Sequence, residues 1–257
     1  MGGLVDIDGH PTWVEDRGGG GAPLLLLHGG LSNSDALLDT IGTGLAEHYR
    51  VVAFDRRGHG YTADTDGDFH YDDMARETVS VLEKVVAGPA HLVGWSDGGI
   101  IALLVALARP DLVKKMVVIG TNYHVDGIQR VEMDPGSSVF QELGRAYAER
   151  SPDGPEHFEV VARKTMQLIS GEPTLTQSQI SRIQQPVLVA VGDDDLVALP
   201  HTVSLYEALP NGQLAVVPGA SHGLPLEQPA TLISLMLPFL AADNPPRTLI
   251  PVRRRTA

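Results

Sequence analysis

Short apolar runs that recur along the chain, each ended by glycine or a polar residue, constrain its fold more than any other feature. Six runs have the length and composition of strands buried on both faces of a sheet: Leu24–His28, Val51–Asp55, His91–Trp95, Met116–Gly120, Pro186–Gly192 and Gln213–Val217. Helical patterning follows most of them: Ser34–His48, Asp72–Val86, Asp97–Arg109, His201–Ala208 and Leu226–Ala241. This alternation predicts an α/β fold, a mostly parallel sheet with helices on both faces.

The segment 121–183 interrupts the alternation. It contains no run typical of a buried strand, and its helix-like pieces are separated by turn-forming residues. We predict a helical insertion that divides the core into residues 1–120 and 184–242. Because open α/β sheets bind ligands beyond the carboxyl ends of their strands, such an insertion could cover the site as a cap. A loop-rich excursion without substrate contact is the alternative, and residues 243–257 are expected to form a mobile tail.

Composition excludes several classes of function. The 257 residues include 19 Lys and Arg, 32 Asp and Glu and no cysteine, giving a net charge of −13. The acidic balance disfavours nucleic-acid and membrane-surface binding, and the lack of cysteine leaves an oxygen or a lysine as any nucleophile. Neither a signal peptide nor an apolar stretch of about 20 residues is recognisable. We expect a cytoplasmic monomer or homodimer that acts on a small molecule without metal or cofactor.

A candidate nucleophile lies in Gly94-Trp95-Ser96-Asp97-Gly98, between a predicted strand and a predicted helix. Glycines two positions on either side of the serine let the strand and helix pass closely, and the tight turn holds the hydroxyl out at the edge of the sheet. A serine needs a base to take its proton, and that base needs an orienting carboxylate. The pattern therefore predicts a nucleophile at Ser96 if such partners follow.

Two later loops supply these partners. His222 follows the last predicted strand, and the aspartates at 193–195 follow the strand before it. The chain order Ser, Asp, His is that of a hydrolase triad, with each member at a strand end. A loop histidine, a helix-capping acid and a turn serine are the structural alternatives for the three residues taken singly.

Glycines after the first buried run suggest how an oxyanion could be bound. Backbone N–H groups can approach a ligand closely there, and we expect those of Gly30 and Asp97, or of Leu31, to form an oxyanion hole. A connecting glycine turn is the alternative. The residues that we predict to contact substrate are Leu31, Trp95, Asp97, Asn122 and Tyr123.

From about Ala22 to Leu240 the chain resembles the α/β-hydrolase superfamily. The matching signatures are His28-Gly29-Gly30, Asp55-Arg56-Arg57-Gly58-His59-Gly60, Gly94-Trp95-Ser96-Asp97-Gly98-Gly99, Gly192 to Val197 and Gly219 to His222. In that superfamily the triad acid follows three residues after the glycine of a G-x-x-D pattern, which implies Asp195 rather than its two neighbours.

The residues 94–99 are most similar to those of the valacyclovir hydrolase type of esterase, which cleaves α-amino acid esters. In that group the acid after the nucleophile recognises the substrate ammonium, so the resemblance implies such a role for Asp97. An acid favoured by the helix dipole is the alternative. Asp55 and Arg57 are expected to be structural.

These observations predict a serine hydrolase of small carboxylic esters or lactones, with Ser96, Asp195 and His222 as the catalytic triad. Three alternatives remain open, because a fold does not fix a function. The first is a carbon–carbon bond hydrolase or enol-lactonase acting on an anionic ring-cleavage product. The second is a cofactor-free haloperoxidase-like activity, and the third is a small-molecule receptor with negligible turnover.

Overall fold

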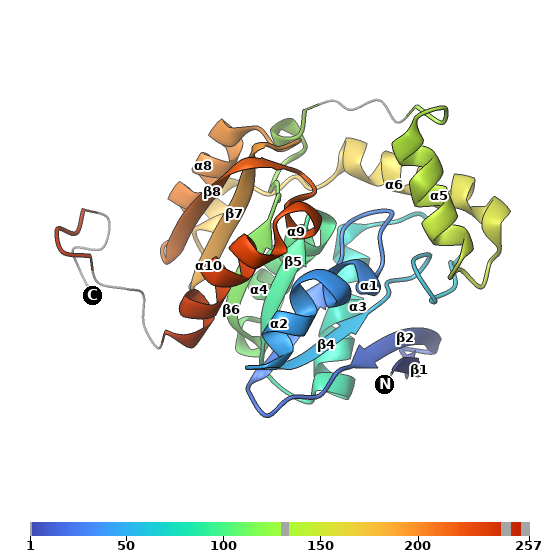
Figure 1. Ribbon diagram of the computed structural model, residues 1–257, viewed down its shortest axis with the longest axis horizontal. Helices are drawn as coiled ribbons and strands as arrows, with labels where there is room; N and C mark the ends of the chain where they lie inside the picture. Colours follow the sequence, from blue (N-terminus) through green and yellow to red (C-terminus); the bar gives the residue numbers. More distant parts are fainter. Residues whose placement is uncertain (1, 130–133, 243–247, 253–257) are drawn as a thin grey trace.

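The computed structural model describes residues 2–129, 134–242 and 248–252. Within them the chain forms an eight-stranded sheet in the order β1-β2-β4-β3-β5-β6-β7-β8 (Figure 1). The strands are β1 (Gly2–Ile7), β2 (His10–Asp16), β3 (Pro23–Leu27), β4 (Arg50–Phe54), β5 (Ala90–Trp95), β6 (Val113–Ile119), β7 (Val187–Asp194) and β8 (Gly212–Ser221). The β1–β2 and β2–β4 pairs are antiparallel, and all pairs from β4 to β8 are parallel.

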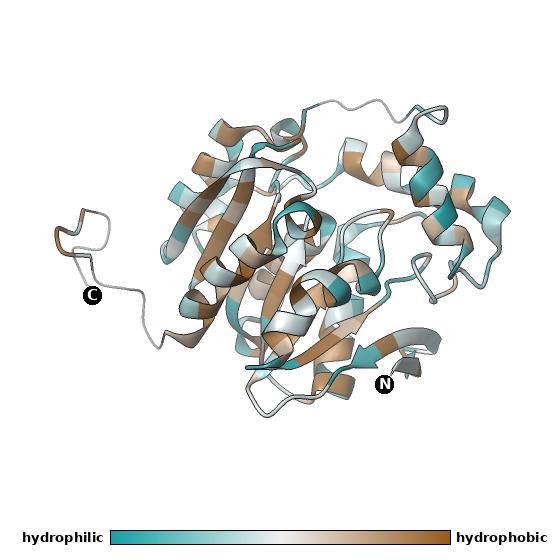
Figure 2. Ribbon diagram, in the orientation of Figure 1, coloured by the Kyte–Doolittle hydropathy of each residue, from teal (hydrophilic) through white to brown (hydrophobic). Residues whose placement is uncertain are grey.

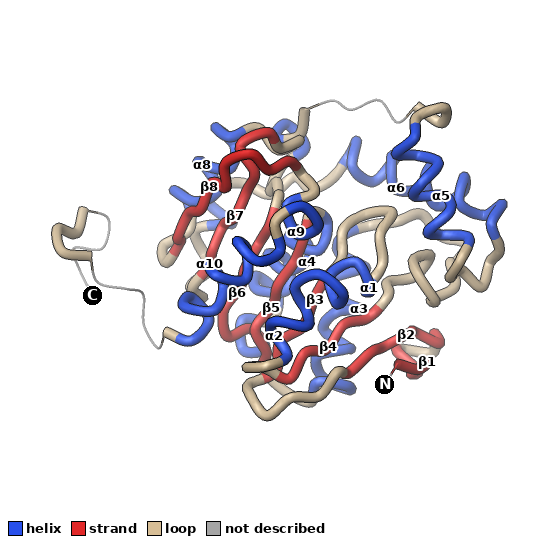
Figure 3. The backbone as a smooth tube through the Cα atoms, viewed as in Figure 1, coloured by secondary structure: helices blue, strands red, loops and turns tan. Residues whose placement is uncertain are grey.

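Helices cover both faces of this sheet, as Figure 3 shows. The α-helices of the described residues are α1 (Ser34–Leu37), α2 (Thr43–Ala46), α3 (Tyr71–Val81), α4 (Asp97–Ala108), α5 (Ser138–Ala148), α6 (Phe158–Gly171), α7 (Gln177–Ile180), α8 (Leu199–Ala208), α9 (Leu224–Glu227) and α10 (Pro229–Ala241). Of these, α5 and α6 lie to one side of the sheet (Figure 1). A π-helical turn at Leu38–Gly42 joins α1 to α2, and a second at Leu82–Val86 extends α3.

Alternate residues of the central strands feed two separate cores. Leu24 and Leu26 of β3 pack on the face covered by α1, α2 and α10, whereas Leu25 and Leu27 pack on the face covered by α3, α4 and α8. Successive strand residues point to opposite faces, so a strand between two helical layers must be apolar throughout. The hydrophobic residues accordingly concentrate in the middle strands (Figure 2).

All six predicted strands are present, and the α/β fold is confirmed. The hairpin of β1 and β2 was not predicted. In β2, Thr12 and Val14 are buried while their neighbours are partly exposed, so the strand lacks a continuous apolar run. It lies near the edge of the sheet with one face covered, where such alternation is expected. The predicted helix at 226–241 is divided into α9 and α10 at Gln228.

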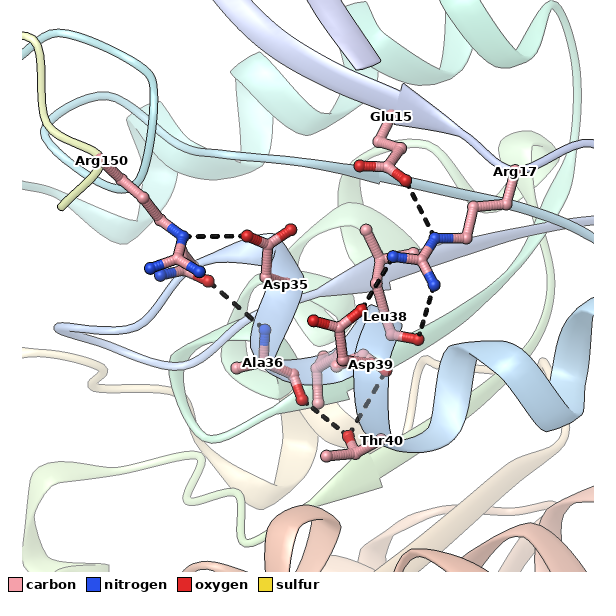
Figure 4. A network of polar contacts seen from close by, with 10 residues as sticks. Glu15, Arg17, Asp35, Ala36, Leu38, Asp39, Thr40 and Arg150 are labelled. Atoms are coloured by element: carbon pink, nitrogen blue, oxygen red, sulfur yellow. Dashed lines mark hydrogen bonds and ion pairs between the residues drawn. The ribbon is translucent and has the colours of Figure 1, made fainter. Parts of the chain in front are cut away.

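The segment 121–183 contains α5, α6 and α7, and ionic contacts tie it to the rest of the chain. Figure 4 shows Arg150, just after α5, reaching Asp35 of α1, with 2.9 Å between Nε and Oδ2. Asp64, in the loop after β4, is almost fully buried, and its Oδ2 lies 2.7 Å from Lys164 Nζ of α6 and 2.8 Å from His157 Nε2. The part of the segment that runs from α5 to α6 is therefore anchored on both α1 and the β4–α3 loop.

One sequence expectation falls partly outside the described ranges. The predicted tail at 243–257 is described only at 248–252, so the rest of that expectation lies outside the described residues. Among the residues that are described, no helix has the length and apolar character needed to cross a membrane.

Candidate active site

Ser96 occupies a strained turn between β5 and α4. Its φ is +54° and its ψ −118°, and its N–H donates to the Ile119 carbonyl at 2.8 Å. A Cβ on Gly94 would lie 2.2 Å from the Gly98 carbonyl oxygen, and a Cβ on Gly98 would lie 2.0 Å from the Leu27 carbonyl oxygen. Only glycine fits at these two positions, because backbone atoms already fill the space. The sequence spacing thus produces the tight strand-to-helix turn that exposes the serine hydroxyl.

Ser96, His222 and Asp195 are brought into one hydrogen-bonded chain. The Ser96 Oγ lies 2.9 Å from His222 Nε2, and His222 Nδ1 lies 2.8 Å from Asp195 Oδ1. Asp195 is buried, and the same Oδ1 accepts the Val197 N–H at 2.9 Å. An ionised carboxylate can only accept, so Nδ1 carries the imidazole proton and Nε2 accepts the serine hydroxyl. This is the arrangement in which histidine can take the serine proton.

Strand pairing explains why residues far apart in sequence meet here. The parallel strands β7 and β8 are in register from Val187 and Gly212, and Asp194 pairs with Ser221 at their carboxyl ends. The next residue of each strand, Asp195 or His222, therefore emerges beside the other. Gly120, with φ +54°, directly follows β6, and a Cβ there would lie 3.0 Å from both side chains.

The structure also distinguishes the three consecutive aspartates. Asp193 and Asp194 are exposed, and Asp193 Oδ1 accepts the Gly219 N–H at 2.7 Å. Asp195 is the one whose carboxylate reaches the histidine ring. The position implied by the family resemblance is therefore the position that contacts His222.

The loop after β3 lies against the turn that carries Ser96. A Cβ on Gly29 would lie 3.3 Å from Ser96 Cβ, and one on Gly30 would lie 2.6 Å from Asp97 Oδ2. Asp97 begins α4, and the N–H groups of a first helical turn have no acceptor within the helix. The two predicted oxyanion donors are thus on neighbouring segments beside the serine.

Asp97 is buried and held by a residue that the sequence did not single out. Its Oδ1 accepts the Tyr71 hydroxyl at 2.8 Å. Burial raises the pKa of Asp97, while the Arg56 charge and the Tyr71 hydrogen bond oppose that rise. Burial also raises the pKa of Tyr71 well above its ordinary value, so the phenol remains a donor. The two partners are 26 positions apart, and the sequence carries no signal for this contact.

Trp95 and Leu31, both predicted to contact substrate, lie in the two segments that flank the serine. The Trp95 indole Nε1 donates to the His222 carbonyl at 2.8 Å, which braces the histidine loop. Leu31 is buried with a φ of +53°, among the core residues on the α3 and α4 face. Their contacts with substrate stay predictions.

Asn122 and Tyr123 follow β6, and both make contacts within the protein. The Asn122 Nδ2 donates to the His124 carbonyl at 3.0 Å. The Tyr123 ring stacks on His201 with 4.2 Å between centroids, and its hydroxyl lies 2.9 Å from Ser204 Oγ. Tyr123 therefore joins the start of the 121–183 segment to α8, and substrate roles for both residues also stay predictions.

No group of three or more His, Asp or Glu residues in the described part of the chain could hold a metal ion. The arrangement around Ser96 is suited to nucleophilic attack on a carbonyl carbon. The serine hydroxyl is hydrogen-bonded to an imidazole, the imidazole is hydrogen-bonded to a buried carboxylate, and the Gly29–Gly30 loop lies beside them.

Comparisons with known proteins agree with this geometry. The sequence model described as "Alpha/beta hydrolase family" matches residues 24–235. The human serine hydrolase BPHL is 26% identical over 240 residues, covering 86% of this chain and 80% of BPHL. A putative carbamate hydrolase, RutD of Agrobacterium fabrum, is 26% identical over 254 residues, covering 88% of this chain and 96% of RutD.

Among solved structures, the CarC serine hydrolase involved in carbazole degradation superposes with a TM-score of 0.77. The identity is 23%, and the match covers 93% of this chain and 98% of CarC, so it shows the shared fold. The family match begins within β3 and includes the parallel strands β4 to β8, the serine turn and the histidine loop described above. The chain therefore belongs to the alpha/beta hydrolase family.

Proposed function

We propose that this hydrolase cleaves a small carboxylic ester or lactone through an acyl-enzyme on Ser96. The observation that carries the proposal is the hydrogen-bonded chain from Ser96 Oγ to His222 Nε2, at 2.9 Å, and from His222 Nδ1 to Asp195, at 2.8 Å. These distances lie in the range for a nucleophile, its base and an orienting acid.

In this mechanism His222 takes the Ser96 proton as the oxygen attacks the carbonyl carbon. The Asp195 carboxylate stabilises the imidazolium that results. The N–H groups of Gly30 and Asp97 bind the developing oxyanion. His222 then protonates the leaving alkoxide, and the acyl group remains on Ser96. A water molecule, deprotonated by His222, releases the acid and restores the serine hydroxyl.

The charge beside the nucleophile supports a preference among esters. Asp97 places a buried carboxylate next to Ser96, and burial raises its pKa. A substrate ammonium near this carboxylate would offset that cost, whereas an anionic acyl group would be repelled. We therefore propose α-amino esters as preferred substrates. The same argument disfavours anionic ring-cleavage products, although their hydrolysis would use the same triad.

An ester panel tests both parts of the proposal. We would compare α-amino acid benzyl esters, p-nitrophenyl acetate and butyrate, and simple lactones in the parent, Ser96→Ala and Asp97→Asn proteins. Asparagine keeps an acceptor for Tyr71 and removes only the charge. We expect Ser96→Ala to lose activity on all of them, and Asp97→Asn to lose selectively the preference for amino esters.

Other outcomes favour other functions. Full ester hydrolysis by Ser96→Ala would refute the serine mechanism. Hydrolysis of simple esters without amino-ester preference would discard only the role of Asp97. A parent protein that turns over nothing in the panel, yet is stabilised by a small molecule, would favour a receptor. Halide oxidation with peroxide and a carboxylic acid would reveal a haloperoxidase-like side activity.

A further inference from the structure

Arg56 is a buried cation whose guanidinium donates to two backbone carbonyls. It follows β4 and is 1% exposed. Its Nη1 donates to the His28 carbonyl at 2.6 Å, and its Nη2 donates to the Gly29 carbonyl at 3.0 Å. Removing a guanidinium from water is strongly unfavourable unless other contacts compensate for it.

The two carbonyls belong to the loop that carries the proposed oxyanion donor. The Gly29 carbonyl and the Gly30 N–H are parts of one planar trans peptide and point in opposite directions. A donor that fixes the direction of the carbonyl therefore fixes the direction of the N–H. Two successive glycines have wide backbone freedom, and this peptide would otherwise sample many orientations.

The Gly29 carbonyl is held from two sides. Arg56 Nη2 donates to this oxygen, and His28 Nδ1 lies 2.7 Å from it. On the other side of the ring, His28 Nε2 accepts the backbone N–H of Arg56 at 3.3 Å. The imidazole is thus neutral with its proton on Nδ1, and the carbonyl's two lone pairs both have donors. Burial and the nearby Arg56 charge hold the pKa of His28 well below its ordinary value, so this contact persists across neutral pH.

We propose that Arg56 is a positioning residue for catalysis: it clamps the Gly29–Gly30 peptide so that the Gly30 N–H points at the oxyanion formed on attack by Ser96. The inference rests on the proposed function of Ser96. Its consequence is a defect confined to the transition state, because the Gly30 N–H is needed most strongly when negative charge develops on the substrate oxygen.

Arg56→Lys is the variant that tests the clamp. Lysine keeps the charge, but its compact ammonium lacks the planar fork that reaches two carbonyls at once. Arg57→Lys is the matched control, because Arg57 is the next residue, is 37% exposed at its side chain and pairs with Glu77 instead. Both variants would be assayed on p-nitrophenyl butyrate, with kcat expressed per active site titrated by a fluorophosphonate.

Removal of one oxyanion donor lowers kcat by about 10²–10³-fold, and a misdirected donor should cost less. We expect Arg56→Lys to lower kcat about 10- to 100-fold with KM changed less than about twofold. The inhibition constant of phenylboronic acid, whose adduct with serine is tetrahedral, should rise by a similar factor. Arg57→Lys should stay within about twofold of the parent in all three quantities.

A merely structural role for Arg56 predicts a different pattern. It would reduce the number of titratable sites while leaving kcat per site and the boronic acid constant unchanged, and that result would overturn the proposal. If Arg56→Lys does not fold, a crystal structure of the parent with phenylboronic acid decides instead. We expect a boronate oxygen within hydrogen-bond distance of Gly30 N, with Arg56 still on the Gly29 carbonyl; an oxygen held elsewhere overturns the clamp.

Failure of the proposed function would appear separately from failure of the clamp. In that case neither the fluorophosphonate nor phenylboronic acid would bond to Ser96 in the parent protein. A parent that is labelled at Ser96, combined with an Arg56→Lys variant of undiminished kcat, would reject the clamp alone.

Discussion

Replacement of Tyr71 by phenylalanine measures what one hydrogen bond contributes to a buried carboxylate beside the nucleophile. The Tyr71 hydroxyl donates to Asp97 Oδ1 at 2.8 Å. Both residues are buried, with exposures of 5% for Asp97 and 1% for Tyr71. Phenylalanine keeps the ring and deletes only the donor. The cavity left by one oxygen is small, so the change in stability should report the hydrogen bond.

The expected size follows from the charge of the acceptor. Hydrogen bonds to charged groups contribute about 1.5–3 kcal/mol, compared with about 1 kcal/mol for neutral pairs. We therefore expect Tyr71→Phe to lower the free energy of unfolding by about 1.5–3 kcal/mol at neutral pH. For a domain of this size that corresponds to a fall in Tm of roughly 3–12 °C.

The loss should depend on pH with a definite sign. Burial raises the pKa of Asp97 above 3.8, and the Tyr71 hydrogen bond opposes that rise. An acid whose folded pKa is raised holds its proton longer in the folded state, so stability falls as pH increases from the unfolded to the folded pKa. Without Tyr71 the folded pKa rises further and this fall becomes larger. The loss of unfolding free energy caused by Tyr71→Phe should be complete above the folded pKa of Asp97. It should shrink to about 1 kcal/mol as pH approaches 3.8, where the folded carboxyl is neutral.

Urea unfolding at about pH 8 and at about pH 3.8, the two ends of this range, is the assay. Tyr49→Phe is the matched control, because Tyr49 is buried in the core on the opposite face of the sheet, with its ring against His91. We expect that control to show no comparable dependence on pH. A Tyr71→Phe defect below about 0.5 kcal/mol, or one of equal size at both pH values, would refute the reasoning.

Three further substitutions test other parts of the structure. Gly98→Ala places a Cβ 2.0 Å from the Leu27 carbonyl oxygen and should cost about 3 kcal/mol or more in urea unfolding; a fully stable variant would contradict the packing of the serine turn. Burial raises the pKa of Glu77 to about 7, so the free energy of unfolding should fall as pH rises from 4.5 to about 7, by at most ~1.4 kcal/mol per pH unit. Glu77→Gln should remove that dependence, and an unchanged pH dependence in urea unfolding would refute this. Lys164→Met leaves the buried Asp64 carboxylate without its lysine and should cost about 3–5 kcal/mol, and a loss under about 1 kcal/mol would show that the pair is dispensable.

The central sheet was predictable because a strand buried on both faces needs consecutive apolar residues, which are visible in the sequence. A strand such as 24–27 is covered on both faces, and four consecutive leucines satisfy that requirement. The serine turn was predictable for the same reason, since close backbone packing admits only glycine at 94 and 98. Local chemistry of this kind leaves a pattern in sequence.

Long-range polar contacts leave no such pattern. The link from Tyr71 to Asp97 joins two helices, and a tyrosine among polar residues gives no sign of a carboxylate partner. Arg56 belongs to a recognisable signature, residues 55–60, but its direction toward the β3 loop depends on how β3 and β4 lie side by side. Asp195 was selected from three adjacent acids by family resemblance, since their residue type and spacing are otherwise equivalent.

The most direct test of the account is mass spectrometry of the protein after reaction with a fluorophosphonate, with ester hydrolysis followed in the same sample. We predict one adduct per chain, located on Ser96, and loss of hydrolysis in proportion to labelling. The Ser96→Ala protein should be neither labelled nor active. Labelling at another residue, or full hydrolysis by Ser96→Ala, would contradict the assignment of Ser96 as the nucleophile.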